Sequence, residues 1–407
     1  MSVNASTLVA ASSAISSSFD LWEPPHIIKP NWANPIKCTS VWDTSTAQAF
    51  SLAEDRYACI DRPSHSLKFS AMPYQKINLL KFRQLLARMA SARTLIPLYC
   101  DQAIMSASGD TELSLTQSPL LFRFDEGTRV FVVSADFSTF EISKITTIGV
   151  SSITVEELDS TFPAGSLVFP AMECQVIPKQ SYDMESPLVI SANLTCLETE
   201  GNCTLSLYNP DTPDLVLGYP VLPDTFNWDA IKMGDARPVH SSMSGRRTIT
   251  STVGYKTPFW VSLNYQFTNR EDAFSFLAFC QYLQGQRRAF WAASPLNEIE
   301  PLLASSTYLL VDKVGELFDW EQISHVAIKL YGQDAIIKEI SSAAENLNTF
   351  QLNFDEAWAG LDIEDIEAVA PAFLARLTSD ELEEEWLTDE VMQISITSLE
   401  LIEEKTL

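Results

Sequence analysis

Two stretches of the sequence have the same pattern: INLLKFRQLLARMASARTLIPLY at residues 77–99 and DAFSFLAFCQYLQGQRRAFWAAS at residues 272–294. Each begins with apolar residues at spacings of three and four, which place the side chains on one face of a helix. Each then passes through a short arginine-containing turn into an apolar run of strand length. The sequence therefore predicts one helix–turn–strand motif that is used twice.

Both predicted helices have recognisable ends. The first is expected from about Gln75 to Ala92, after a strand closed by Pro73. In the second, Asn269 is the expected N-cap and Gly285 the expected stop. The apolar stripe of the first helix consists of Leu79, Phe82, Leu85, Leu86 and Met89. The arginines before Phe290 and Trp291 suggest a nucleic-acid stacking platform, but such a platform needs more basic residues. We expect Phe290 or Trp291 to enter the core instead.

The segments around both motifs are predicted to be β-strands. Residues 65–72 and 258–267 alternate apolar and polar residues, as half-buried strands do. Residues of about 106–178 and about 301–376 are runs of short strands separated by turn residues, typical of a small barrel or sandwich. The C-terminal residues 380–401 are rich in glutamate, but their alternation favours a hairpin over a helix.

The two halves of the chain can be aligned. The order of elements agrees over almost 180 residues, which favours a tandem duplication. An offset of 194 relates Phe82 to Phe276, Leu85 to Phe279, Met89 to Leu283 and Ile96 to Phe290; an offset of 201 relates 169–176 to 370–377; and one of about 204 relates Ile190 to Ile394.

This alignment predicts the fold class and the domains. We expect a predominantly β protein of the α+β class, with two tandem similar halves. An N-terminal arm occupies residues 1–35, the first half 36–215 and the second half 216–407. Each half is predicted to be a β-sandwich-like sheet with one long helix and a small β-barrel-like insert.

Composition limits the classes of function. The chain has 407 residues and a net charge of −26, which argues against wrapping DNA or binding an anionic membrane. The acidic runs at 361–369 and 381–390 are most simply solvated faces. Alternatively, they form the wall of a DNA conduit, where like charge keeps the polyanion from adsorbing.

The cysteines, the N-terminal segment and the length of the apolar runs indicate the cellular compartment. Seven scattered cysteines match no zinc spacing, so free thiols in a reducing cytoplasm are expected. Residues 1–19 lack a positively charged start, and we interpret them as a docking arm rather than a signal peptide. No run of 18 apolar residues is present, so no membrane span is predicted.

No catalytic, cofactor-binding or metal-binding residue is predicted. The four histidines, His26, His65, His240 and His325, form no HExxH motif or Cys/His cluster. No nucleophile elbow, P-loop or dinucleotide fingerprint is present, and the turn-like segments at 125–129 and 241–247 are expected to be loops. A hydrolase with two carboxylates stays open in principle, but no pair stands out. We therefore expect a protein that is not an enzyme and needs no cofactor.

Several segments resemble tail-tip proteins of long-tailed bacteriophages, the distal tail and baseplate hub group. The resemblance is carried by PNWANPIKCTSVWDTSTAQAFSLAEDRYACIDRPSHSLKFSAM (30–72), FPAMECQV (169–176), FLAFCQYLQGQRRAFWAASPLNEIE (276–300) and PAFLARLTSDELEEEWLTDEVMQISITSLEL (371–401). It implies a structural protein without enzymatic residues that joins the tail tube to the tip and receptor-binding proteins.

The resemblance also implies partners and a location. Self-association into a ring is expected, as a trimer with pseudo-sixfold symmetry or as a hexamer. The other expected partners are tube, tape-measure and tip or fibre proteins, with DNA only in passage and no membrane insertion. The location would be the virion tail, after synthesis in the host bacterial cytoplasm.

A carbohydrate- or receptor-binding module is the alternative. In that case the two inserts are lectin-like, and exposed aromatic side chains on their loops stack on sugars. Trp320 and Trp358 are the candidates, although core packing is the simpler role for both.

Overall fold

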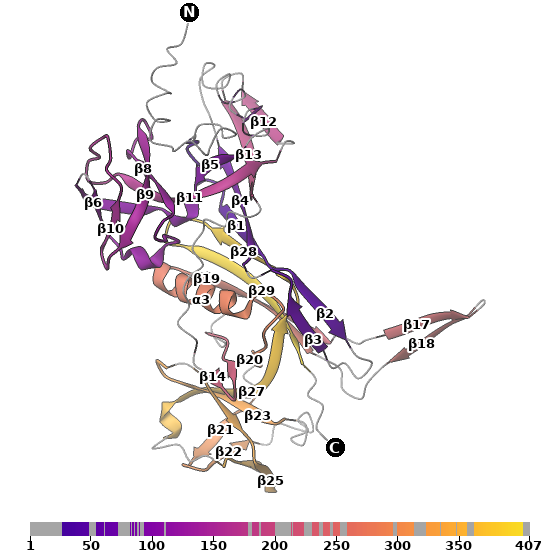
Figure 1. Cartoon of the computed structure of the whole chain (residues 1–407). Coiled ribbons are helices and arrows are strands. Elements are labelled where there is room, and N and C mark those ends of the chain that lie inside the picture. Colours follow the sequence, from indigo (N-terminus) through magenta and orange to yellow (C-terminus); the bar gives the residue numbers. More distant parts are fainter. Residues whose placement is uncertain are drawn as a thin grey trace, which may run out of the picture.

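The computed structural model is mostly β, with one large antiparallel sheet and a single continuous α-helix in the described part of the chain (Figure 1). None of the described helices has the length and apolar character to cross a bilayer. The structure describes residues 27–401 except 49–53, 61, 72–81, 83, 85, 88, 90–92, 110, 178–180, 187–188, 200–212, 214, 224–229, 236–238, 245–246, 253–258, 296–298, 313–322, 334, 347 and 356–361.

The N-terminal strands pair in the order β1–β4–β13–β12. The outer side of β13 is shared by β12 and β11, and β11 pairs in turn with β5. A hairpin, β2–β3, connects β1 to β4. The strands are β1 (Ile36–Val41), β2 (Thr44–Gln48), β3 (Glu54–Ala58), β4 (Ser64–Ala71), β5 (Thr94–Pro97), β11 (Leu167–Val176), β12 (Ser181–Ser186) and β13 (Val189–Glu198).

The C-terminal strands pair in the order β16–β19–β29–β28, with β27 on the outer side of β29 and β20 beyond it. A hairpin, β17–β18, connects β16 to β19. The predicted C-terminal hairpin is confirmed by the β28–β29 pair. The strands are β16 (Ala230–Asp235), β17 (Val239–Ser244), β18 (Arg247–Thr252), β19 (Phe259–Phe267), β20 (Phe290–Ala293), β27 (Ile366–Leu377), β28 (Glu381–Trp386) and β29 (Met392–Glu400).

One further pairing joins these two groups of strands. β1 lies between β4 and β28, in antiparallel pairing with both. The chain therefore contains one unbroken antiparallel run, β16–β19–β29–β28–β1–β4–β13–β12. Figure 1 shows β28 beside β1, although more than 300 residues separate them in the sequence.

Helix α3 (Arg270–Leu283) covers one face of this sheet. The Asn269 side chain accepts a hydrogen bond of 2.8 Å from the Asp272 N–H, which confirms the predicted N-cap. The helix ends at Gln284 and Gly285, both left-handed, as expected of a C-terminal stop. The Phe276 ring lies 4.7 Å from Tyr265 and 5.1 Å from Phe267 (centroid distances), so the helix packs on β19.

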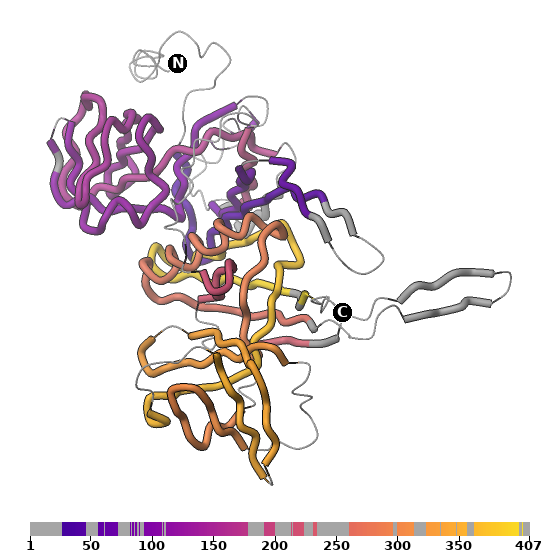
Figure 2. The backbone as a smooth tube through the Cα atoms, turned by 60° about the horizontal axis from the view of Figure 1, so that its bottom comes forward, coloured from indigo at the N-terminus to yellow at the C-terminus, as the bar shows by residue number. Residues whose placement is uncertain are grey.

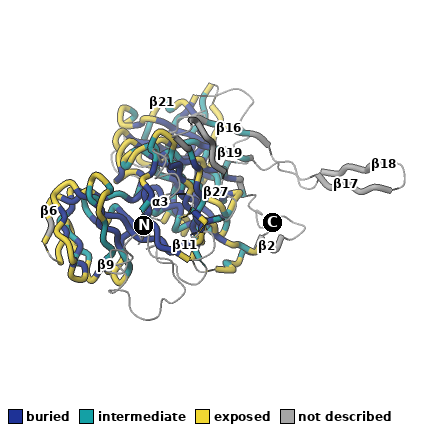
Figure 3. The backbone as a smooth tube through the Cα atoms, turned by 90° about the horizontal axis from the view of Figure 1, so that it is seen from above, coloured by how far each residue is buried: buried dark blue, intermediate teal, exposed yellow. Residues whose placement is uncertain are grey.

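The predicted first helix is described only in part. Its described positions are helical, and Phe82, Leu86 and Met89 are buried as the stripe predicts. Leu79 and Leu85 lie outside the described residues. These side chains share a single hydrophobic core with Phe276 and Leu283, and this core extends under both groups of strands (Figure 3).

The first insert leaves the sheet after β5 and returns through β11. Its pairings run β6–β7–β10–β9–β8–β11, and β11 also pairs with β6, so the circuit closes. The last strand of this predicted run of short strands is the long strand β11 (Leu167–Val176). The elements are η1 (Tyr99–Asp101), β6 (Ala103–Ser108), β7 (Glu112–Leu115), η2 (Pro119–Leu121), β8 (Arg129–Val133), β9 (Phe140–Ile148) and β10 (Ser152–Val155).

The second insert has a different arrangement. A four-stranded sheet, β21–β22–β26–β25, shares a core with β23 and β27, and β24 pairs with β23. The two inserts are separate modules at different ends of the molecule (Figure 2). The elements of this insert are β21 (Pro301–Ala304), β22 (Tyr308–Asp312), β23 (His325–Leu330), β24 (Ile336–Glu339), β25 (Ser342–Asn346), β26 (Thr349–Asn353) and η4 (Ile363–Asp365). A separate short pair, β14 (Leu215–Val216) and β15 (Tyr219–Pro220), precedes β16 in the chain.

Candidate functional site

The β1–β28 pairing, called the seam below, extends over six residue pairs from Ile36–Trp386 to Val41–Glu381. The Lys37 ammonium lies 2.7 Å from a Glu383 carboxylate oxygen and 3.3 Å from one of Glu385. These carboxylates raise the pKa of Lys37, chiefly through the hydrogen bond to Glu383. The ion pairs join the two groups of strands on one face of the sheet.

The composition suggested that the acidic run at 381–390 is a solvated face. The ion pairs show instead that its first part belongs to the sheet. This part is the strand β28, whose glutamates alternate between the two faces of the sheet. Glu383 and Glu385 pair with Lys37, whereas Glu384 is buried on the opposite face. The acids of the other run, Glu364 and Glu367, are exposed as predicted.

The sheet face opposite α3 carries uncharged hydrogen-bonding side chains. Across β19 and β29, Gln393 donates to Gln266 at 2.9 Å and Thr397 to Ser262 at 3.1 Å. Ser395 donates to Asn264 between these two pairs. A hollow of about 510 Å³ lies on this face beside Glu383 and Glu385. We call this the polar face.

Charges on the polar face are balanced among the described side chains. Along the eight-strand run, the alternation places Lys37, Lys68 and Lys232 on this face together with the acids Glu381, Glu383 and Glu385. These six side chains together carry no net charge. A balanced polar surface offers a polyanion neither strong attraction nor strong repulsion.

A cluster of buried charges lies beneath the seam. The Arg123 guanidinium donates to Glu384 at 2.5 Å and lies 3.6 Å from Asp101. The Arg270 guanidinium pairs with the other oxygen of Asp101. Two arginines and two acids, each almost fully buried, thus neutralise each other. The first insert supplies Arg123, helix α3 supplies Arg270, and β28 supplies Glu384.

Arg270 also binds three backbone carbonyls. It donates to Leu121 and Cys100 at 2.9 Å each and to Asp389 at 2.7 Å. Its guanidinium carbon stands over the rings of Phe122, at 4.3 Å, and Trp386, at 4.6 Å. Sequence reasoning assigned Arg270 no role. The available signal was a cation in the first helical turn, where the helix dipole disfavours positive charge.

A serine and a histidine meet next to this cluster. The Ser40 hydroxyl lies 3.0 Å from His65 Nδ1, and the Glu198 carboxylate accepts the backbone N–H of His65 rather than its ring N–H. The adjoining cavity measures about 10 Å³, room for at most one water. Burial, and secondarily Arg123, lowers the pKa of His65 to about 3. This geometry orients a neutral core histidine and leaves no space for a substrate.

The remaining predicted residues fall in different places. Phe290 and Trp291 are buried, as predicted, and His325 is buried with its ring centroid 4.4 Å from that of Trp291. His26, Trp320 and Trp358 lie outside the described residues. Residues 241–244 and 247, expected to belong to a loop, lie in the paired strands β17 and β18, because the antiparallel pairing extends as far as Ser244 opposite Arg247.

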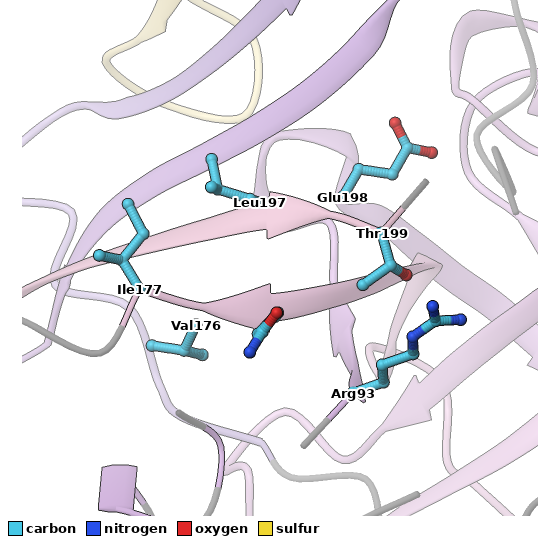
Figure 4. Close-up of a pocket in the computed structure, with 7 residues that line it drawn as sticks. Arg93, Val176, Ile177, Leu197, Glu198 and Thr199 are labelled. Atoms are coloured by element: carbon cyan, nitrogen blue, oxygen red, sulfur yellow. The ribbon is translucent and has the colours of Figure 1, made fainter. Parts of the chain in front are cut away.

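A second hollow, of about 500 Å³, lies where β11 and β13 end (Figure 4). Three aliphatic residues, Val176, Ile177 and Leu197, line it together with polar ones, and Arg93 lies near Thr199. Within the described residues no three His, Cys, Asp or Glu side chains gather as metal ligands. The six cysteines that the structure describes are free.

No family model matches the chain, and no curated protein matches its sequence. The fold, the seam and the polar face are therefore the basis for any inference about function.

Proposed function

We propose that this protein is a structural ring component of a phage tail tip, a distal tail or baseplate hub protein. The observation that supports this most directly is the unbroken eight-strand antiparallel run, with helix α3 on one face and the polar face on the other. Copies set side by side would continue this run into a closed wall around a channel. The sequence resemblance to tail-tip proteins points to the same role.

We further propose that residues 36–198 and 230–400 are one folding unit repeated in tandem. The pairing orders β1–β4–β13–β12 and β16–β19–β29–β28 match strand for strand, and each unit has a hairpin between its first two strands. The pairings also adjust two sequence offsets. Ile96 lies opposite Met172, and Ala292 lies opposite Phe373, the counterpart of Met172 at the offset of 201. The counterpart of Ile96 is therefore Ala292 rather than Phe290. By the same reasoning, the counterpart of Ile394 is Ala192 rather than Ile190.

A duplicated unit favours a ring of three chains with pseudo-sixfold symmetry. Each chain would contribute two equivalent segments, which adapts a sixfold tube to a threefold tip. The inserts, a six-stranded barrel and a two-layered sandwich in this proposal, would bind neighbouring tube, tape-measure and tip or fibre proteins. The polar face would line the channel and let DNA pass without specific binding.

Native mass spectrometry and negative-stain imaging of the purified full-length protein test this function. We expect a closed ring of three copies with a central hole, a hexamer being the other closed form. We expect no turnover of cell-wall or polysaccharide substrates. A protein that remains monomeric at micromolar to hundred-micromolar concentrations would contradict the proposal.

A further inference from the structure

Within the eight-strand run, two strands have an edge that pairs with no described strand. β16 pairs only with β19, and β12 pairs only with β13. They are the first and last strands of the eight-strand run and lie at its opposite ends. An unpaired edge exposes backbone N–H and C=O groups that readily pair with another strand.

The seam provides a template for how such edges meet. Strands β16 and β1 occupy the same place in the two pairing orders, and so do β12 and β28. Leu67 and Val261 each precede the helix of their own half by the same number of residues, so we take them as counterparts. Counting along the paired strands from these two residues, Lys37 corresponds to Lys232 and Glu385 to Asp183. The full sets of counterparts are Ile36–Ile231, Lys37–Lys232 and Cys38–Met233 for the first edge, and Trp386–Met184, Glu385–Asp183 and Glu384–Tyr182 for the second.

We propose that β16 of one copy pairs antiparallel with β12 of the next copy, with Lys232 directly opposite Asp183. This rests on the proposed ring function and identifies the strands that close the ring. The register repeats the seam: the Lys37–Glu385 pair becomes Lys232–Asp183, and the apolar pair Ile36–Trp386 becomes Ile231–Met184. Lys232 is exposed in the single chain and is free to meet a partner carboxylate.

The hairpin β17–β18 belongs to the same contact. Its counterpart, β2–β3, is held by the other group of strands, since Thr44 bonds Asp380 at 2.9 Å and Arg56 bonds Gln286 at 2.6 Å. β17–β18 pairs with no other described strand, and an isolated two-stranded hairpin is marginal in water. The neighbouring copy would supply the surface that β2–β3 finds within its own chain (Figure 1).

This contact is heterologous, because two different edges meet. Such contacts produce a ring when the rotation closes and a filament when it does not. Each chain contributes eight strands to the wall, so three copies would give a continuous barrel of twenty-four strands. The polar face would be its inner surface.

A pair of cysteines tests the register. Opposed residues of an antiparallel pair have Cα atoms about 4.5–5.5 Å apart, within the span of a disulfide. In a background with Cys59→Ser and Cys203→Ser, which removes the exposed cysteine among the described residues and the one cysteine outside them, Lys232→Cys and Asp183→Cys together should form intermolecular disulfides under mild oxidation. We expect a covalent species of three chains, nothing longer, on a non-reducing denaturing gel, and none from either single substitution.

The outcomes separate the interface from the function. Rings in native mass spectrometry without the cross-link would overturn the β16–β12 pairing and leave the ring function standing. An open ladder of covalent species would support the strand pairing and contradict the closed ring. A monomer without cross-links would overturn both.

Charge reversal provides a second, independent test. Lys232→Glu or Asp183→Lys should each lower the population of rings at least tenfold by placing like charges opposite each other. The double variant Lys232→Glu with Asp183→Lys should restore them. Lys144→Glu, which reverses an exposed charge on the first insert, should leave assembly unchanged. Failure of the double variant to recover while circular dichroism shows a folded chain would contradict the pairing.

Discussion

Arg270 is the residue at which local and tertiary preferences conflict most. A cation in the first turn of α3 is disfavoured by the helix dipole, but the buried Asp101 carboxylate and three carbonyls surround its guanidinium. The tertiary contacts outweigh the local cost because they satisfy groups that have no access to water. The cluster therefore keeps the seam in register from below.

We expect Arg270→Ala to lower the free energy of unfolding by about 3–5 kcal/mol, because it leaves Asp101 with one partner fewer in a buried site. Urea unfolding followed by tryptophan fluorescence would measure the change. Arg287→Ala is the matched control, since Arg287 is exposed in the turn after the same helix and should change stability by at most about 0.5 kcal/mol. An equal effect of the two substitutions would refute the role of the cluster.

His65 makes stability depend on pH at the residue scale. Its pKa is lowered to about 3 in the folded protein, from an ordinary value near 6.5, so the unfolded chain binds more protons between these values. The neutral histidine thus stabilises the fold fully above pH 6.5, and this contribution falls as the pH drops. His65→Gln should weaken the loss of stability between pH 7.5 and 5, measured by urea unfolding. Identical pH profiles for the two proteins would contradict this.

At the scale of elements, Gly285 connects α3 to β20 and the sheet. It has a φ of +65°, and a Cβ atom there would come within 2.4 Å of Asp380 Oδ1. Asp380 accepts hydrogen bonds from the N–H groups of Gln286 and Thr44, so the turn, the seam and the β2–β3 hairpin meet at one carboxylate. The predicted helix stop is therefore also a contact between elements.

Gly285→Ala should destabilise the protein by about 2 kcal/mol or more, from left-handed strain together with displacement of Asp380. Thermal unfolding by calorimetry would give the change. Gly218→Ala is a suitable control, since Gly218 has a φ of +86° but no atom within 4 Å of the added Cβ. The loss of stability in Gly218→Ala should reflect backbone strain alone. The additional loss in Gly285→Ala therefore measures the effect of displacing Asp380.

The sequence was most informative about elements with a clear period. The alternation in β4, β19 and β29 and the three-and-four spacing of α3 predicted these elements correctly, because one face of each packs on a shared core. The seam was not predictable, since pairing between β1 and β28 joins residues more than 300 positions apart. The glutamates of β28 read as a solvated run because their partners, Lys37 and Arg123, come from distant segments.

At the scale of the whole molecule, the distribution of charge matters more than its total. The chain carries a net charge of −26, yet the eight-strand run places three lysines and three glutamates on the polar face among its described side chains. These charges cancel locally, and the amide and hydroxyl side chains beside them are uncharged. In the proposed ring, this surface would face the channel. It would neither attract nor repel DNA strongly, so the DNA could pass.

We expect the assembled protein not to retain double-stranded DNA at physiological salt, because phosphate binding requires an excess of cations. Gln393→Lys with Ser395→Lys adds two positive charges to the polar face of each chain and should produce binding that weakens as salt rises. Gel-shift titrations between 50 and 200 mM salt would measure it. Thr146→Lys with Ser151→Lys, on the exposed surface of the first insert, adds the same charge outside the proposed channel and should bind markedly less. Equal binding by the two variants would show that the polar face does not line a channel wide enough for DNA.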